Sequence, residues 1–239
     1  MTKKELKAKR FRDLQRKLKS VAIDAGDQWG LWLKPAKNES ERAEIMIGAV
    51  LVQRASWANA TLALAQLRDC GLMDLKRIFV CDENDLAKLI KPAGCHTSKS
   101  RCLKSLAELV TRRYKTASAM MNAETVVLRQ NLLSVKGIGF ETADSILLYA
   151  LEKPTMVVDE YTRRLAVDTW PKNAWPKASP PAAVDKKLYL FLKNVFEEAL
   201  ERDARVFQEI HARIVIYGQK NSGSKTAKPG RPTRGIQKR

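Results

Sequence analysis

The sequence predicts an all-α protein, and two observations carry that prediction. Apolar residues recur every three or four positions in most segments, as in residues 100–114 and 189–200. Strict alternation of apolar and polar residues, the mark of a strand, is rare. Val157-Val158 is the best candidate for a strand, and we expect it to be loop. With 239 residues, the chain is long enough for a real core and for one or two small domains.

Capping and breaking residues place several helix ends. Asp82 or Asn84 is suited to cap a helix that stops at Pro92, and residues 91–99 are expected to form a turn. Gly218 ends the last helix. Residues 1 to about 20 are expected to form a basic helix or a frayed arm. Further helices are expected to open at Ser40 or Glu41, to run from Trp57 to near Gly71, to stop at Pro92, and to start at Tyr161. The remaining expected helices cover residues 74–79, 100–114, 123–134, 141–151, 189–200 and 204–217.

The net charge of +18 is concentrated at the two ends of the chain. Residues 1–20 carry +7, and residues 219–239 carry another +7 and are rich in glycine and proline, so we expect a disordered tail there. Such basic arms attract polyanions, with binding that weakens as salt rises. A merely solubilising surface is the alternative.

No apolar run approaches the roughly 20 residues that span a bilayer, and no apolar segment follows the basic N-terminus. We therefore expect a cytoplasmic protein, associated with the nucleoid, that makes no use of a membrane. Cys70, Cys81, Cys95 and Cys102 fit no zinc or haem spacing, so we expect them to be reduced and buried, with no metal held by side chains.

A glycine-rich stretch separates two of the predicted helices. Gly137 and Gly139 bracket Ile138 just before the helix at 141–151, and two such glycines allow a tight turn with exposed backbone N–H groups. The unpaired N–H groups of the following helix suit a phosphate oxygen, to which Lys136 adds a charge. Ile138 is expected to pack between the helices. From this spacing alone, a plain corner between two helices fits as well.

The wider stretch narrows these alternatives. Lys-Gly-Ile-Gly-x-Glu-Thr-Ala-Asp-x-Ile-Leu-Leu-Tyr-Ala, followed by Pro154 and Val-Val-Asp-x-Tyr-Thr-Arg-Arg, resembles the helix-hairpin-helix (HhH-GPD) DNA glycosylase superfamily, and most closely its endonuclease III branch. The similarity runs nearly without gaps over residues 133–164. In that family the hairpin binds the DNA backbone, often with a monovalent cation at the hairpin backbone. The resemblance therefore implies these DNA-binding residues: Lys136, Gly137, Ile138, Gly139 and Thr142.

The resemblance also assigns the catalytic residue. In the family, the Asp that follows Val-Val stabilises the sugar cation, and here it is Asp159. The same Asp suits the N-cap of the helix that starts near Tyr161, and the two roles are compatible. Bifunctional relatives add a nucleophilic lysine two residues past the second hairpin glycine, a position occupied here by Glu141. We therefore expect a monofunctional glycosylase with little AP-lyase activity, since Lys136 lies before the hairpin and is not expected to substitute.

Two further segments bear on DNA and base binding. Residues 47–57 resemble the family's Ala-Val-Leu-x-Gln-x-Thr stretch, whose Gln fills the gap left by the flipped nucleotide; here it is Gln53. Ala55 departs from the pattern, because the family usually has a hydroxyl residue there. Trp29 and Trp32 suit either a hydrophobic anchor for the N-terminal segment or a stacking wall for an extruded base. His96 is expected to be an ordinary solvated histidine in a loop.

The C-terminal segment distinguishes branches of the family. Many relatives hold an iron–sulfur cluster with four cysteines downstream of a His…Gly segment. No cysteine follows the matching residues 211–218, so we expect no cluster. With Glu141 and the paired tryptophans, this resembles the 3-methyladenine DNA glycosylases of endonuclease III type. A mismatch uracil/thymine glycosylase, which would share Asp159, and a helix-hairpin-helix module that binds DNA without catalysis are the alternatives.

The resemblance implies a two-domain fold with the active cleft between the domains. We expect a monomer that binds double-stranded DNA containing a damaged base. The expected parts are a basic arm or helix at 1–20, a discontinuous helical domain at 21–47 plus 159–218, a helical domain at 48–158 with the hairpin at about 125–151, and a basic disordered tail at 219–239.

Overall fold

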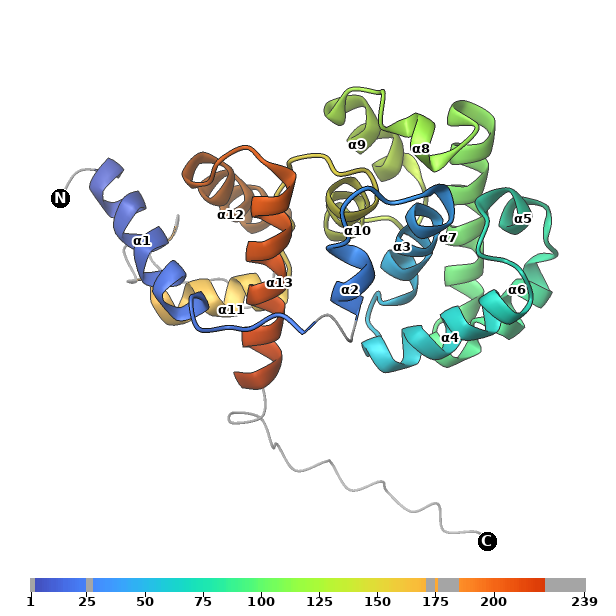
Figure 1. Cartoon of the computed structure of the whole chain (residues 1–239), viewed down its shortest axis with the longest axis horizontal. Helices are drawn as coiled ribbons and strands as arrows, with labels where there is room; N and C mark the ends of the chain where they lie inside the picture. The colour runs from blue at the N-terminus through green and yellow to red at the C-terminus, as the bar shows by residue number, and fades with distance from the viewer. Residues whose placement is uncertain (1–2, 25–27, 171–174, 176–184, 222–239) are drawn as a thin grey trace, which may run out of the picture.

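The structure is a computed structural model, and it describes residues 3–24, 28–170, 175 and 185–221. Within these ranges it contains helices and no strand, so the all-α prediction is confirmed (Figure 1). The expected tail at 219–239 lies outside the described residues from position 222 onward. The helices are α1 (Lys3–Leu18), α2 (Gln28–Trp32), α3 (Glu39–Leu51), α4 (Trp57–Asp69), α5 (Leu75–Val80), α6 (Glu83–Leu89), η1 (Lys91–Ala93), α7 (His96–Leu109), η2 (Val110–Tyr114), α8 (Ala117–Met120), α9 (Thr125–Ser134), α10 (Phe140–Ser145), η3 (Ile146–Ala150), α11 (Glu160–Thr169), α12 (Lys186–Ala199) and α13 (Ala204–Asn221).

The helices form two groups (Figure 1). We call α1 and α11–α13 the terminal lobe, and α2–α10 with η1–η3 the hairpin lobe. In the terminal lobe α1 packs against α11, α12 and α13, and Leu14 and Leu18 of α1 are buried. The N-terminal segment is therefore a docked helix. The lobes meet where α13 contacts η3.

The helix α3 organises the hairpin lobe. It packs against α4, α7, α8 and η3, and nine of its residues are buried. It begins at Glu39, just before the predicted start at Ser40 or Glu41, because Asn38 forms a capping box with Glu41. The expected domain boundary between residues 47 and 48 falls inside this continuous helix, and the division of the chain into domains stays a prediction.

Short polar residues cap several helices as the sequence predicts. Asp82 accepts from the backbone N–H groups of Asn84 and Asp85 and caps α6, which resolves the choice between Asp82 and Asn84. The segment Val157-Val158 is a buried loop, as expected. This loop leads directly into α11 and so positions Asp159, the residue that follows Val158.

The predicted turn at residues 91–99 is wrong at its end, because α7 already begins at His96. Gly94 and Cys95 have φ angles of 69° and 46°, and these two left-handed residues reverse the chain early enough for the helix to start. The ammonium of Lys99 is buried within this helix and donates to the carbonyl oxygens of Leu51 (2.7 Å) and Ala93 (2.8 Å). His96 therefore lies in the first turn of a helix and not in a loop.

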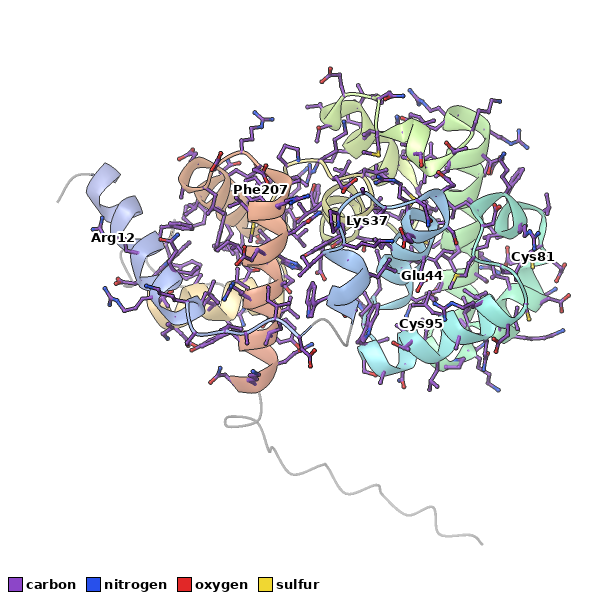
Figure 2. The ribbon with its side chains drawn as sticks, in the orientation of Figure 1. Arg12, Lys37, Glu44, Cys81, Cys95 and Phe207 are labelled. Carbon is purple, nitrogen blue, oxygen red and sulfur yellow. The ribbon has the colours of Figure 1, made fainter. Side chains whose placement is uncertain are left out.

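All four cysteines are free thiols. Cys102 is buried, whereas Cys70 and Cys95 are exposed, so the expectation that all are buried is wrong. Figure 2 shows Cys81 on the side of the hairpin lobe away from α13. Across the described ranges, no group of three or more His, Cys, Asp or Glu residues could hold a metal ion. No helix described in the structure is long and apolar enough to cross a membrane.

Candidate active site

Asp159 stands at the start of α11, at the end of the buried loop that leaves the hairpin lobe. One of its carboxylate oxygens, Oδ1, accepts hydrogen bonds from the backbone N–H (2.7 Å) and the hydroxyl (2.8 Å) of Thr162. This is the capping box of α11, so the N-cap role is confirmed. The residue is 8% exposed. The cap uses Oδ1, so the other carboxylate oxygen, Oδ2, takes no part in the bonds to Thr162.

One buried residue to which the sequence assigned no role, His211, lies beside this second oxygen, and a second, Tyr149, contacts the far side of the His211 ring. His211 of α13 places its Nε2 3.6 Å from Asp159 Oδ2, too far for a hydrogen bond but close enough for a charge interaction. Its other ring nitrogen, Nδ1, lies 2.7 Å from the hydroxyl oxygen of Tyr149 in η3. Three elements from both lobes therefore converge on the carboxylate. The His…Gly segment at residues 211–218 is the sequence signal that contains this histidine.

Opposing effects act on the Asp159 carboxyl. Burial alone raises its pKa, but the neighbouring His211 and the two hydrogen bonds from Thr162 outweigh burial and hold the pKa below its usual value. Asp159 is therefore an ionised carboxylate at neutral pH. A negative charge kept at the wall of a cavity favours a cation placed next to it.

The cavity at Asp159, which we call the inner cavity, has a volume of about 330 Å³. It is lined by both lobes. Its aromatic walls are Trp29, Trp32, Trp57 and Tyr161, and its polar groups include Gln53, Glu141, Thr142, Asp159 and His211.

The structure brings both predicted tryptophans to this cavity. Trp29 and Trp32 form the short helix α2, 4% and 5% exposed, with ring centroids 6.3 Å apart in an edge-to-face arrangement. Trp32 also packs against Tyr149 (5.0 Å) and Trp57 (5.6 Å). The two tryptophans are core residues and cavity walls at once, so their geometry fits both alternatives from the sequence. Sequence reasoning had used Trp57 only as a helix start.

Tight packing also explains one glycine near the cavity. The Tyr161 ring lies directly on the backbone of Gly218, where a Cβ atom would come within 2.7 Å of Tyr161 Cγ. A side chain at this position of α13 would displace the tyrosine that closes one wall of the inner cavity. The expectation that Gly218 ends the last helix is wrong, because α13 continues to Asn221. The glycine is instead explained by the contact with Tyr161.

The hairpin between α9 and α10 makes its turn at one glycine. Gly137 has a φ of 97°, and a Cβ there would lie 3.1 Å from Cys102 Sγ, so both backbone and packing favour glycine. Gly139, in contrast, has a φ of −92° and open space where a Cβ would lie. Of the two glycines, only Gly137 is needed for the turn. Ile138 is buried as expected, and Lys136 is exposed.

Gln53 joins the end of α3 to the hairpin. Its amide nitrogen donates to the Gly137 carbonyl (3.0 Å) and to the Thr142 hydroxyl (2.9 Å). A second, larger depression of about 620 Å³, the outer groove, runs along this hairpin. The inner cavity and the outer groove share the walls made by Gln53, Glu141 and Thr142.

Glu141 therefore lies at the mouth of the inner cavity. Partial burial of its carboxyl and the negative charges of Asp159 and Glu160 raise its pKa to about 7. The residue is exposed to solvent, and water at the mouth screens part of this effect. Among the described residues that line the inner cavity, none is a lysine.

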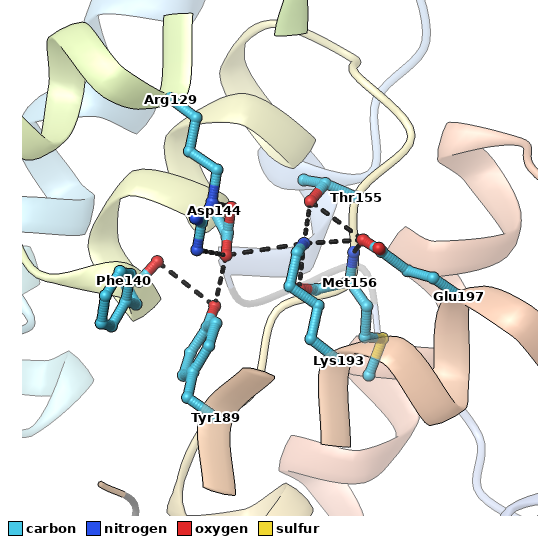
Figure 3. A network of polar contacts seen from close by, with 8 residues as sticks. All are labelled: Arg129, Phe140, Asp144, Thr155, Met156, Tyr189, Lys193 and Glu197. Carbon is cyan, nitrogen blue, oxygen red and sulfur yellow. Dashed lines mark hydrogen bonds and ion pairs between the residues drawn. The ribbon is translucent and has the colours of Figure 1, made fainter. Parts of the chain in front are cut away.

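A buried ionic network supports the site from behind (Figure 3). Asp144 of α10 is fully buried and accepts from Arg129 Nε (2.7 Å), Arg129 Nη2 (2.9 Å) and the Tyr189 hydroxyl (2.7 Å). The pKa of Arg129 is raised by this bidentate bond. Lys193 of α12 lies 3.5 Å from Asp144 and 2.6 Å from Glu197.

The network connects the lobes and the loop before Asp159. Lys193 donates to the Met156 carbonyl (3.1 Å) and to the Thr155 hydroxyl. Glu197 accepts from the backbone N–H of Met156 (2.9 Å). The chain three residues before Asp159 is thus held from α12, which in turn is held by the hairpin helix through Asp144.

Comparison with known proteins agrees with this geometry. Residues 47–188 match the HhH-GPD superfamily of base excision DNA repair proteins. A protein of Methanocaldococcus jannaschii named "Putative DNA repair glycosylase MJ1434" is 34% identical over 206 residues, which cover 85% of this chain and 86% of the relative.

Solved structures share the fold. The 3-methyladenine DNA glycosylase MagIII of H. pylori, bound to 1,N6-ethenoadenine, superposes with a TM-score of 0.66 at 24% identity, covering 91% of this chain and 96% of that one. A non-covalent complex of endonuclease III with DNA gives a TM-score of 0.64 at 14% identity, covering 95% and 91%. The family match covers more than half of the chain and includes the hairpin, Gln53 and Asp159. The chain belongs to the HhH-GPD superfamily of base excision DNA repair proteins.

Proposed function

We propose that the protein is a monofunctional DNA glycosylase that hydrolyses the N-glycosidic bond of a flipped, alkylated purine such as 3-methyladenine. The observation that carries this proposal is the inner cavity. It combines one ionised carboxylate, aromatic walls and no lysine among its described lining residues. Cleavage of the bond passes through a sugar with positive charge at C1′, and a fixed carboxylate stabilises that charge.

The choice of an alkylated purine follows from charge and stacking. Alkylation at N3 or N7 gives the purine a positive charge and weakens its bond to the sugar, so the base leaves without being protonated. A cationic ring stacks favourably on electron-rich indoles, and Trp29, Trp32 and Trp57 line the inner cavity. At about 330 Å³, the cavity is near the lower end of the roughly 300–1,000 Å³ usual for small-molecule sites.

We propose that DNA lies along the outer groove, with the hairpin on its backbone. Lys136 is exposed and Gly139 leaves open space, as close approach of a phosphate requires. The fold similarity to endonuclease III bound to DNA supports this placement. In this proposal Thr142 contributes to DNA binding, Gln53 fills the gap left by the flipped nucleotide, and a monovalent cation binds at the hairpin backbone.

We further propose that the protein acts as a monomer in the cytoplasm and without an iron–sulfur cluster. Its cysteines are spread over the hairpin lobe, and none lies on α13. Iron and sulfide analysis of protein purified without oxygen tests the cluster, and light scattering with and without DNA tests the oligomeric state. Stoichiometric iron and sulfide would contradict the first proposal.

The test of function uses duplexes that contain 3-methyladenine, 7-methylguanine, uracil opposite guanine, or an abasic site. Base release and strand cleavage are scored separately, with Asp159→Asn as the control. We expect release of alkylated purine, no strand cleavage, and no release by the control. Release of uracil instead would assign the protein to the mismatch glycosylases. DNA binding without any release would make it a binding module.

The residue at the lyase position allows a second test. Glu141→Lys places an amine at the cavity mouth, where it can attack C1′ and form a Schiff base. We expect the variant, but not the wild type, to cleave abasic strands and to be trapped on DNA by borohydride. Glu141→Gln is the matched control, because it removes the charge without supplying an amine. Strand cleavage by the wild type would contradict the monofunctional assignment.

A further inference from the structure

His211 carries an unsatisfied nitrogen at the wall of the inner cavity. Its Nε2 is buried and has no hydrogen-bond partner among the described residues. The residue is 5% exposed, so bulk water does not reach it freely. Native proteins satisfy buried donors and acceptors, with ordered water where no protein group is in reach. The nitrogen therefore indicates that something else occupies the space in front of it.

Tyr149 contacts the ring nitrogen of His211 that lies away from Asp159. The Tyr149 hydroxyl lies 2.7 Å from His211 Nδ1 and 3.3 Å from the Gln208 carbonyl. Burial and the charge of Asp159 raise the pKa of Tyr149 well above its usual value, so the hydroxyl keeps its proton. The hydroxyl hydrogen can be donated to either partner, and we assign it to the shorter contact, so that Nδ1 accepts it. With Nδ1 as acceptor, the ring hydrogen lies on Nε2, which faces Asp159.

A water molecule on the cavity side can bridge Nε2 and Asp159 Oδ2. The two atoms are 3.6 Å apart, and both residues line the inner cavity. An oxygen atom on the cavity side can lie about 2.8 Å from each of them, at ordinary hydrogen-bond length. Because Thr162 occupies Asp159 Oδ1, Oδ2 is the carboxylate oxygen left to accept a proton from that water.

We propose that His211 Nε2–H and Asp159 Oδ2 together hold the water that attacks C1′, with Tyr149 as the residue that positions His211. This inference rests on the proposed function. The water accepts a hydrogen bond from His211 and donates one to Asp159, so its remaining lone pair is free to face the sugar. In this step His211 serves as the hydrogen-bond donor to the water.

The step is balanced without a further reactant. The bond between C1′ and the base nitrogen breaks, and its electron pair leaves with the base, which neutralises the alkylated cation. The water oxygen forms the new bond to C1′. Its proton passes to Asp159 and then to solvent. The low pKa of Asp159 suits this order, because the carboxylate first stabilises the sugar cation and accepts the proton only once the water has begun to bond to C1′.

The kinetic test measures single-turnover base release with protein in excess over an alkylated duplex. His211→Phe removes the donor, and we expect the rate of the chemical step to fall roughly 10- to 100-fold. His211→Gln, whose amide N–H reaches a similar position, should recover part of the rate. Tyr149→Phe should give a smaller loss. His96→Gln, at the only other histidine of the chain, is the matched control and should not change the rate.

Two readouts separate this role from a merely structural one. The Kd for a duplex with an uncleavable abasic analogue should stay within about twofold of wild type for every variant that circular dichroism shows to be folded. In mixtures of water and methanol, the share of methyl glycoside should rise in His211→Phe towards the share of methanol in the solvent, since the held water no longer has an advantage.

A crystal structure of the free wild-type protein gives a readout that does not depend on turnover. We expect an ordered water within hydrogen-bond distance of both His211 Nε2 and Asp159 Oδ2. Absence of that water, or a wild-type rate and product ratio in the folded His211→Phe and His211→Gln variants, would overturn the inference while base release upheld the proposed function. If the wild type releases no base from any duplex, the proposed function fails, and this role for His211 fails with it.

Discussion

The buried ionic network offers the sharpest test of how this fold holds its site. Asp144→Asn keeps the volume of the side chain but removes the charge that faces Arg129 and Lys193, and an amide nitrogen would replace one of the oxygens that accept from Arg129 and Tyr189. Removing one partner of a buried ion pair destabilises by about 3–5 kcal/mol. The side chain of Arg129 is 21% exposed and Lys193 keeps Glu197, so we expect the lower end, about 3 kcal/mol.

Urea denaturation followed by circular dichroism measures this loss of unfolding free energy. For a chain of this size, about 3 kcal/mol corresponds to a fall in Tm of roughly 6–12 °C. Asp85→Asn is the matched control. It also breaks an aspartate pair, with Lys88, but those side chains are 64% and 76% exposed, so the change should stay within about 1 kcal/mol. A loss for Asp144→Asn no larger than that of the control would refute the reasoning.

Three further outcomes follow from the site. Asp159→Asn keeps the oxygen that accepts from Thr162, so it should abolish most base release at nearly unchanged stability. Asp159→Ala should abolish base release and also lose about 1 kcal/mol of unfolding free energy, because the cap is lost. Equal stability of the two variants in urea would contradict the capping role. Glu141 is protonated below its pKa of about 7 and charged above it, so the rate of single-turnover base release should rise with pH through that value. Glu141→Gln should show no such rise. A wild-type pH profile in this variant would contradict the assignment of the pH dependence to Glu141. Gly218→Ala should displace Tyr161, slow base release and lower Tm, as thermal melts and single-turnover assays would measure. An unchanged Tm and an unchanged rate would contradict the role of this contact.

Local rules predicted much of the fold, because helix periodicity and capping act over a few residues. Asp82 and Asp159 cap the helices they were expected to cap. The start of α7 at His96 was missed because the reversal depends on left-handed backbone at Gly94 and Cys95, and a cysteine gives little indication of that conformation.

The site was predicted only where a motif identifies it. Asp159, Gln53 and the hairpin lie together as the resemblance implied, and Trp29 and Trp32 reach the same cavity. His211 and Tyr149 were missed, because a buried histidine and tyrosine read as core residues until the fold brings them beside a carboxylate. The ionic network was missed for a similar reason: Asp144 and Lys193 are 49 positions apart and share no local pattern.

The two hydrogen bonds of Gln53 carry a consequence for how the protein moves along DNA. While both amide hydrogens are donated to Gly137 and Thr142, the side chain is held against the hairpin. Inserting it between bases means giving up both bonds, at about 0.5–1.5 kcal/mol each before new ones form. Undamaged duplex, whose stacked bases resist opening, does not compensate for that loss. If Gln53 is the wedge, as proposed above, the protein slides with this side chain retracted and inserts it only where a weakened base has already begun to leave the helix.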